Sequence, residues 1–398
     1  MFATYTIANP QHGGQKRVRA IYDAYTKSSK ININFCAVYY PPHYQEHWSG
    51  DISIPRQHSS LMASNPLTGD VITGRLVRDD KKIRAKIVKK IKETNPDIIH
   101  IEQPFLYIGL KEILDEIKYV GKIIYGSQNI EYPMKEEMLE GMGYDLEPMK
   151  AIVKEIKEIE IEISKRADLV FCVSEGDIKS LVKLGIAKSK ILLARNGIEK
   201  QNVNSVEEKY WDDYFKEMGV DKIAVFVGSA HPPNWTGFQA MIGSKIGFLK
   251  RNERIVLAGS IGEYFKNSFS HGMTNEVLFW KRIIATGRLS EDRLTGLLGR
   301  ADCLLLPLIE GGGSNLKTAE ALLSQKPIVG TSHGFRAFEM YLDYPTINVS
   351  DDPENFRKLI AKVLREKPPK LSNRQVEKLD LVTWDYCLKA AVEGVIKL

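Results

Sequence analysis

The sequence lacks the features that mark several common protein classes. No apolar run approaches the roughly 20 residues that a membrane-spanning helix requires. Met1 leads directly into a strand candidate at residues 2–8, without the basic and apolar segments of a secretory signal. A formal net charge of +6 over 398 residues is too small to indicate nucleic-acid binding, and no basic segment is interleaved with aromatic residues.

Cysteine is scarce as well. Cys36, Cys172, Cys303 and Cys387 are far apart, lie mostly within apolar segments and form no Cys-x-x-Cys pair. This spacing excludes a disulfide framework and a zinc site. We therefore expect four small core residues in a reducing compartment, and hence a cytoplasmic protein.

Two glycine motifs of nucleotide-binding proteins are also missing. The sequence contains no Gly-x-x-x-x-Gly-Lys-Ser/Thr, which excludes a P-loop. No Gly-x-Gly-x-x-Gly follows an N-terminal strand, which argues against dinucleotide binding.

What the chain does contain is a regular alternation of strand-length apolar runs with longer helical patterns. Such alternation predicts α/β architecture with parallel sheets and crossover helices. The length favours two domains of roughly 200 residues each. The strand candidates are residues 33–40, 98–103, 122–125, 169–173 and 191–194 in the first half, and 224–228, 255–259, 283–286, 303–307 and 327–331 in the second.

The most informative segment begins after the apolar run 303–308, where three glycines precede a helical pattern that starts near Asn315. Uncovered backbone N–H groups and the positive end of a helix dipole favour a diphosphate. Lys317 adds a full charge, and Glu320, one turn later, can accept hydrogen bonds from two sugar hydroxyls. Together they predict a nucleotide site. The alternative is a flexible surface loop with Glu320 as a solvated helix residue.

Several motifs in a fixed order resemble the retaining GT-B glycosyltransferases called family four, or glycosyl transferases group 1. That family includes relatives of sucrose synthase and bacterial mannosyltransferases. The motifs are Lys317, Glu320, Ala321 and Leu322; Gln325-Lys326-Pro327-Ile328-Val329-Gly330-Thr331; Ala167-Asp168-Leu169-Val170-Phe171-Cys172-Val173-Ser174; Arg195-Asn196-Gly197-Ile198; and Val225-Phe226-Val227-Gly228-Ser229.

The resemblance implies two Rossmann-like, doubly wound parallel-sheet domains facing a cleft. Residues 1–203 would bind the acceptor and residues 204–377 the nucleotide sugar, with a boundary within residues 199–205. A C-terminal helix at 378–398 would pack back on the first domain. The donor-binding residues implied by the family pattern are Glu310, Gly312, Gly313, Ser314, Asn315, Leu316, Lys317 and Glu320.

In the first domain the resemblance assigns catalytic positions to Gly13 and Gly14, whose backbone would approach the transferred sugar or the acceptor. The third catalytic position, Glu102, departs from the family, which often carries a histidine there. A carboxylate at this point would suit an acceptor hydroxyl or act as a base. It would equally suit a structural arginine, and both alternatives stay open. His100 is interpreted as a satisfied core histidine.

Two further departures concern the donor loop. Nine residues separate Glu310 from Glu320, a longer interval than in many relatives, so the backbone of Gly312 and Gly313 can replace Glu310 as the contact to the sugar. The segment 228–234 lacks the arginine and lysine that many relatives place there. Lys317 then becomes the main cationic contact to the leaving group, with Arg288 and Arg336 as candidate helpers.

The family mechanism begins with departure of the nucleoside diphosphate, and the acceptor hydroxyl then attacks from the same face, which retains the anomeric configuration. Lys317 and the helix N-terminus would stabilise the leaving group. No Asp-x-Asp motif sits at a plausible donor strand, so we predict that no metal ion or other cofactor is required beyond the nucleotide sugar. Domain closure would exclude water.

From Arg75 to Lys92 the chain is densely basic, with Ile83, Ile87 and Ile91 at every fourth position. This pattern predicts one basic amphipathic helix. It can lie on the inner face of an anionic membrane, which would suit a lipid-linked acceptor. Alternatively, its apolar stripe packs on the core.

Two function classes follow from these observations. The favoured one is a sugar transferase acting on a glycan, a lipid-linked acceptor or a small molecule. Its rival is a non-catalytic nucleotide or carbohydrate binder on the same scaffold. An epimerase of a UDP sugar is a further alternative, although such enzymes lack the Lys-x-x-Glu signature.

Overall fold

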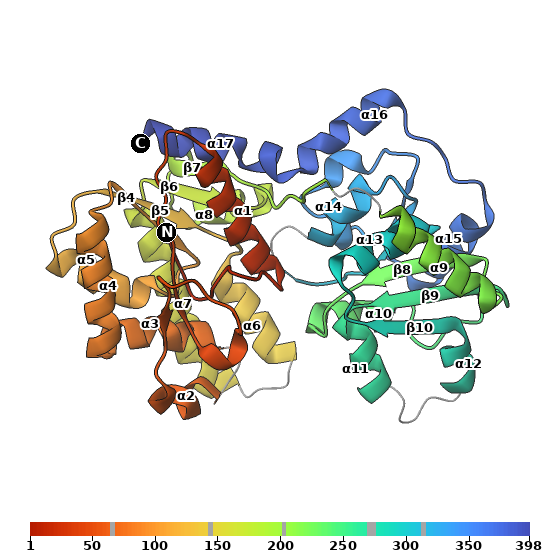
Figure 1. The fold of residues 1–398 in the computed structure, drawn as a ribbon, viewed down its shortest axis with the longest axis horizontal. Helices are drawn as coiled ribbons and strands as arrows, with labels where there is room; N and C mark the ends of the chain where they lie inside the picture. The colour runs from red at the N-terminus through yellow and green to blue at the C-terminus, as the bar shows by residue number, and fades with distance from the viewer. Residues whose placement is uncertain (64–67, 142–145, 201–203, 269–275, 312–315) are drawn as a thin grey trace. The chain divides into compact units, whose positions relative to one another are not determined.

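In a computed structural model the chain forms two compact units (Figure 1). The first unit comprises Met1–Asn196 together with Cys387–Leu398, and the second comprises Gly197–Tyr386. The structure describes residues 1–63, 68–141, 146–200, 204–268, 276–311 and 316–398.

The first unit is built on a parallel sheet of seven strands in the order β3-β2-β1-β4-β5-β6-β7. Chain order reverses between β1 and β4, so the carboxyl ends of these two strands form the switch point of the sheet. The strands are β1 (Phe2–Ala3), β2 (Cys36–Tyr39), β3 (Ile52–Ser53), β4 (Ile98–Glu102), β5 (Lys122–Gly126), β6 (Leu169–Cys172) and β7 (Ile191–Leu193).

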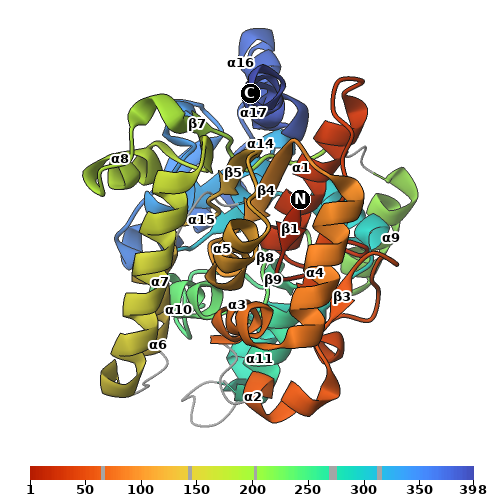
Figure 2. The same ribbon diagram turned by 90° about the vertical axis from the view of Figure 1, so that its left-hand side faces the viewer.

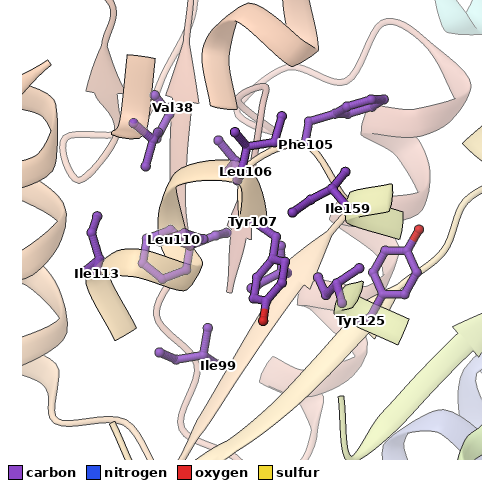
Figure 3. Packing of buried hydrophobic residues seen from close by; sticks show 14 of the residues in the cluster. Val38, Ile99, Phe105, Leu106, Tyr107, Leu110, Ile113, Tyr125 and Ile159 are labelled. Carbon is purple, nitrogen blue, oxygen red and sulfur yellow. The ribbon is translucent and has the colours of Figure 1, made fainter. Parts of the chain in front are cut away.

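Side-chain alternation along β4 explains how helices cover both faces of this sheet. Ile99 and Ile101 point into a large apolar core (Figure 3), whereas His100 points to the opposite face, where it meets Tyr25 of α1. Helices α3, α4 and α5 pack against one another around this core (Figure 2). The helices are α1 (Gly13–Lys27), α2 (Ser59–Ala63), α3 (Gly69–Asp79), α4 (Lys81–Thr94), α5 (Tyr107–Glu116), α6 (Glu131–Gly141), α7 (Leu146–Arg166) and α8 (Glu175–Lys183).

The second unit contains a parallel sheet of six strands in the order β10-β9-β8-β11-β12-β13, with its switch point between β8 and β11. Along β8, Ile223 and Val225 face one apolar core while Ala224 and Phe226 face another, so helices cover both faces. The strands are β8 (Lys222–Val227), β9 (Glu253–Ala258), β10 (Ile283–Gly287), β11 (Cys303–Leu306), β12 (Ile328–Gly330) and β13 (Ile347–Val349). The helices are α9 (Ser205–Glu217), α10 (Pro232–Met241), α11 (Ser260–Ser268), α12 (Glu276–Arg282), α13 (Glu291–Arg300), α14 (Leu316–Leu323), α15 (Pro353–Arg365), α16 (Asn373–Lys378) and α17 (Trp384–Lys397).

Two parallel-sheet α/β units confirm the predicted fold class. The strand predicted at residues 2–8 is shorter than expected, because only Phe2 and Ala3 pair with neighbouring strands. Thr4 and Tyr5 are buried, but they continue beyond the sheet into the switch point. The prediction also missed β3 and β13, which are too short to show a clear pattern.

The single basic helix predicted from Arg75 to Lys92 is wrong, since the chain forms two helices that meet at Asp80. Asp80 has an extended backbone, and its carboxylate accepts hydrogen bonds from the backbone N–H groups of Lys82 and Ile83, which starts α4. Ile83, Ile87 and Ile91 lie in the core, at most 4% exposed. The apolar stripe is therefore unavailable for membrane insertion. No helix among the described residues is both long and apolar enough to cross a bilayer.

Helix α17 ends the chain, and its part from Cys387 onward belongs to the first unit. Leu388, Ala391 and Val395 are buried there. Gly394 lies so close to β7 that a Cβ atom would come within 2.5 Å of Leu192 Cδ1. All four cysteines of the chain are buried and none forms a disulfide.

A close approach between α10 and the chain after β11 gives a test of the second unit. A Cβ atom at Gly237 would lie 2.0 Å from the carbonyl oxygen of Pro307, whereas nothing lies within 4 Å of a Cβ at Gly247. Gly237→Ala should lower the free energy of unfolding by about 1–3 kcal/mol because α10 must move away from the sheet. Gly247→Ala is the control and should melt like the unmodified protein. Equal melting temperatures for both variants, measured by calorimetry, would contradict this packing.

Candidate functional site

Each unit presents its functional candidates at the switch point of its own sheet. In open parallel sheets ligands bind beyond the carboxyl ends of the strands at such points. In the second unit the loops after β8 and β11 meet there. In the first unit the segments after β1 and β4 do so.

Glycines let three strand ends of the second unit approach one another closely. Gly228 follows β8, Gly259 follows β9, and Gly287 ends β10. Gly259 has φ +96°, and a Cβ atom there would lie 2.3 Å from the carbonyl oxygen of Gly228. Its N–H donates to the carbonyl oxygen of Gly287 at 2.8 Å. At the carboxyl ends of these strands the backbone is therefore covered by few side chains.

Lys317, in the first turn of α14, reaches across the switch point to the first turn of α10, the helix that follows β8. Its Nζ donates a hydrogen bond to Oδ1 of Asn234 at 2.9 Å. Asn234 is 4% exposed, and its amide nitrogen donates to the carbonyl oxygen of Ser229 at 2.9 Å, so its orientation is fixed. Burial lowers the pKa of Lys317 from 10.5 to about 8, a shift that nearby Glu320 opposes and Arg336 reinforces.

Glu320 lies one turn after Lys317 on α14, as the sequence spacing predicted. The two side chains line one small internal cavity with Val225, Val227 and Ala321. Leu316, the first residue of α14, is partly buried beside the same edge. The structure thus brings a lysine and a glutamate together at the carboxyl ends of β8 and β11.

The residues before α14 form a second group. Gly311 has φ +106°, which favours glycine, and the Nε2 atom of His333 lies 3.1 Å from its carbonyl oxygen. Arg336 contacts His333 and adds a second cation near Lys317. Glu310 accepts a hydrogen bond from Thr236 Oγ1 at 2.5 Å, which ties the donor loop to α10.

Not every predicted donor residue is placed. Gly312, Gly313, Ser314 and Asn315 lie outside the described residues. Arg288, proposed as a helper, is exposed. It forms no hydrogen bond or ion pair with the other described residues. Of the two candidate arginines, the structure therefore brings only Arg336 to Lys317.

In the first unit, α1 begins at the predicted glycine pair Gly13–Gly14 and is capped by His12 Nδ1, which accepts from the N–H of Gln15. A Cβ atom at Gly14 would lie 2.8 Å from Tyr5 Oη and 3.0 Å from Gln128 Oε1. A larger residue at this position would force the Tyr5 hydroxyl to move and would disturb the Gln128 amide.

Glu102 is buried inside the first unit, with no exposed surface. Its Oε1 lies 2.9 Å from His100 Nε2, and its Oε2 accepts from Gln128 Nε2 at 2.8 Å. Burial raises the pKa of the Glu102 carboxyl, but His100, Arg17 and Gln128 together outweigh burial and hold the pKa below its ordinary value. The Glu102 side chain contacts protein groups here, not solvent.

A chain of polar contacts connects Glu102 to the glycine pair. Gln128 Nε2 also donates to Tyr5 Oη at 2.7 Å, and Tyr5 lies against Gly14. On the other side, the hydroxyl of Tyr25 lies 3.0 Å from His100 Nδ1. Arg17 supplies positive charge and donates to the carbonyl oxygen of Ala194 at 2.7 Å. Glu102 is thus positioned to orient Gln128 and Tyr5 beneath the start of α1.

The sequence interpretation missed the residues that orient these side chains. Asn234 stood at the end of the segment 228–234, which was noted for lacking Arg and Lys, whereas Thr236 and Gln128 lay outside every motif of the sequence. The adjacent pair Pro233-Asn234 is the sequence signal that could have identified Asn234. Within the described ranges, no group of three or more His, Cys, Asp or Glu side chains is arranged to hold a metal ion.

Comparison with solved structures shows that the fold is GT-B. HepE from Anabaena, crystallised with UDP, superposes with a TM-score of 0.68 at 12% identity over 98% of each chain. Sucrose-phosphate synthase from Thermosynechococcus elongatus gives 0.68 at 12% identity over 100% of this chain and 97% of the other. WaaG, a glycosyltransferase of lipopolysaccharide biosynthesis, gives 0.62 at 13% identity over 100% and 98%.

A comparison with known protein families gives a match for part of the chain. Residues 221–366, which contain β8 to β13 of the second unit, match the family described as glycosyl transferases group 1. No curated protein matches the sequence. The part of the chain that matches the family therefore includes Asn234, Glu310, Lys317 and Glu320.

The burial of Glu102 predicts a cost in stability when its charge is removed. Glu102→Gln leaves Arg17 without a buried negative charge and His100 without its carboxylate neighbour, and should lower the free energy of unfolding by about 3 kcal/mol. The control is Glu112→Gln, on the exposed face of α5, where an ion pair at 3.6 Å to Arg84 should be worth less than about 1 kcal/mol. Urea unfolding measures both. A Glu102→Gln protein as stable as the control would contradict the structural role.

Proposed function

We propose that this protein is a glycosyltransferase that moves a sugar from a nucleoside-diphosphate sugar to a hydroxyl acceptor with retention of the anomeric configuration. The observation that carries the proposal is the Lys317–Asn234 hydrogen bond beside Glu320 at the switch point of the second unit. The family match of residues 221–366 supports transfer chemistry. HepE, a structural neighbour, was crystallised with UDP and with UDP-glucose, which supports a nucleotide sugar as donor.

Each donor-site residue has a distinct task in this proposal. The Lys317 ammonium, held by Asn234, faces the diphosphate and stabilises the negative charge that develops as the bond to the sugar breaks. Arg336 supplies additional positive charge. Glu320 accepts hydrogen bonds from the ribose hydroxyls. Glu310, fixed by Thr236, and the backbone of Gly312 and Gly313 hold the transferred sugar.

The first unit binds the acceptor in this proposal, with residues 1–203 and the C-terminal helix as its domain and residues 204–377 as the donor domain. Gly13 and Gly14 allow the start of α1 to approach the reacting groups. Glu102 acts as a positioning residue, because its buried carboxylate orients Gln128 and Tyr5 and does not reach solvent. A cytoplasmic location fits the buried, unbonded cysteines.

Retention follows if the acceptor hydroxyl attacks from the face that the leaving group has just left. The departing phosphate oxygen can then take the proton of the acceptor hydroxyl. This route needs no protein base, which agrees with the absence of solvent exposure at Glu102. The chain's own contribution is charge stabilisation by Lys317 and exclusion of water.

A non-catalytic nucleotide or carbohydrate binder on the same scaffold is the rival function, because Glu102 replaces the family histidine. An epimerase is the remaining alternative. A panel of nucleotide sugars screened by thermal shift identifies the donor. Release of nucleoside diphosphate that depends on an added acceptor then establishes a transferase, and binding without release in any acceptor mixture establishes the rival.

Donor affinity should depend on the two charged residues of α14. Lys317→Ala and Glu320→Ala each remove a charged contact worth about 1.5–3 kcal/mol. Each should therefore raise the dissociation constant of the donor about tenfold or more. Lys358→Ala, at an exposed lysine of α15 paired with Glu354, is the control. Calorimetric titration with the donor measures all three. If both α14 variants bound the donor with unchanged affinity, the assignment of these residues to the donor site would be wrong.

Donor affinity should also fall as the pH rises through the pKa of Lys317. Burial lowers that pKa to about 8, so the free protein loses the ammonium charge between pH 7 and pH 9. A bound diphosphate favours the charged form, and affinity is therefore expected to be highest below pH 8. Lys317→Arg keeps its charge throughout this range and should flatten the profile. A flat profile in the unmodified protein would show that Lys317 does not contact the diphosphate.

Turnover should survive chelation. Lys317, Arg336 and the start of α14 can stabilise the diphosphate without an ion. Activity measured with excess EDTA should therefore remain within about twofold of the untreated rate, a difference of less than about 0.5 kcal/mol in the barrier. Complete loss that manganese or magnesium restores would show instead that a metal ion carries the leaving-group charge.

A further inference from the structure

A second polar cluster lies at the carboxyl edge of the first sheet and has no role in the steps above. We call it the Asp70 cluster. Its members come from the segments after β1 and β4 and from helices α3 and α6, which the fold brings together; they are Thr4, Asp70, Gln103, Glu131 and Lys135.

Asp70 is the centre of this cluster and its reachable member. Thr4 Oγ1 lies 2.8 Å from Asp70 Oδ1 and 3.2 Å from Gln103 Oε1. Lys135 Nζ lies 3.8 Å from Asp70 Oδ2. The Asp70 side chain is 33% exposed, whereas that of Lys135 is 10% exposed. The carboxylate is therefore held in place from beneath and remains accessible from solvent.

Glu131 is fully buried, and the charge of Asp70 acts on it. Neither of its carboxylate oxygens has a hydrogen-bond partner at regular geometry among the described residues, although the side chains of Asn129 and Gln103 lie close enough to lower its pKa. Burial raises the pKa of Glu131 to about 7; Asp70 adds to this shift, whereas Lys135, Asn129 and Gln103 oppose it. Buried polar groups without regular hydrogen bonds are uncommon in native proteins, and a functional role is one of the explanations for them.

The backbone gives an independent indication. Gln103 has φ +60°, a left-handed conformation that a residue with a long side chain seldom adopts. Such strain is concentrated at ligand sites, where the surrounding structure enforces it. Here it turns the chain immediately after β4, next to Thr4. The charge of Asp70 also acts on His12, which caps the helix that starts at Gly13–Gly14.

The charges of the cluster indicate what it can bind. Two carboxylates face one ammonium, and that ammonium is already close to Asp70. The accessible Asp70 carboxylate accepts hydrogen bonds but cannot donate them, so it favours hydroxyl groups and disfavours phosphate or carboxylate.

We propose that Asp70 and Gln103, supported by Thr4, Glu131 and Lys135, form the acceptor subsite, and that the acceptor is an uncharged polyhydroxylated group such as a sugar unit without phosphate. This inference rests on the proposed function. Asp70 would accept hydrogen bonds from two neighbouring hydroxyls, and the Gln103 amide would add a third contact. The group recognised in this way lies beside the glycine pair that starts α1.

Direct binding of simple sugars tests the subsite without any donor. The probes are the methyl glycosides of glucose, galactose, mannose and N-acetylglucosamine, together with glucose 6-phosphate and fructose 6-phosphate. Saturation-transfer NMR on the full chain should detect at least one neutral glycoside and neither phosphate. Asp70→Asn should weaken that signal about tenfold, since it removes a charged hydrogen-bond acceptor.

Two further variants separate recognition from folding. Gln103→Asn keeps an amide and tolerates the left-handed backbone, so it should fold normally and still lose binding. Asp79→Asn is the matched control on the same helix, because Asp79 is exposed and pairs with Arg78. It should bind like the unmodified protein. Circular dichroism and melting temperatures establish that each variant is folded.

The outcomes distinguish this inference from the proposed function. Binding of neutral glycosides that both Asp70→Asn and Gln103→Asn weaken supports the subsite, whether or not a nucleotide sugar binds to the second unit. Preference for the phosphorylated sugars, or the absence of any neutral signal that these variants weaken, overturns the subsite. In that case donor binding and acceptor-dependent release of nucleoside diphosphate can still establish the transferase.

Discussion

The hydrogen bond between Lys317 and Asn234 joins the first turns of α14 and α10, the two helices that begin at the switch point of the second sheet. A lysine withdrawn from water retains its charge less readily, and a neutral amide orients it without neutralising it. The surrounding features serve this arrangement. The buried amide of Asn234 is fixed by Ser229, and Thr236 in the same helix fixes Glu310. Glycines at three strand ends keep the adjoining edge free of side chains.

In the first unit a buried charged group, rather than a neutral amide, orients the polar side chains. This group is the carboxylate of Glu102, which lies against His100 and is stabilised by the positive charge of Arg17. Because a buried charge must be paired, this group fixes Gln128 and Tyr5 in single orientations. Rigid polar side chains beneath the start of α1 then define where an approaching sugar would meet the backbone of Gly13–Gly14.

Much of the architecture could be predicted from the sequence, since strand-length apolar runs alternate with helices and each buried strand needs cover on both faces. The positions of Lys317 and Glu320 followed from helical spacing alone. The interruption at Asp80 could not be predicted from periodicity, because the apolar stripe continues through it and only the cap geometry breaks the helix. The burial of Glu102 and the roles of Asn234 and Gln128 depend on contacts between distant segments, such as the bond from Lys317 to Asn234. A single sequence carries no local signal for those contacts.

The division of the chain also affects its folding during synthesis. The second unit is one continuous segment, whereas the first unit includes Cys387–Leu398 at the far end of the chain. Leu388 and Ala391 in that segment are buried. Every strand of the first sheet is therefore synthesised long before α17, the helix that covers part of this unit. Until Cys387–Leu398 has been synthesised, the nascent first unit exposes an apolar surface, and the second unit can complete its own core earlier.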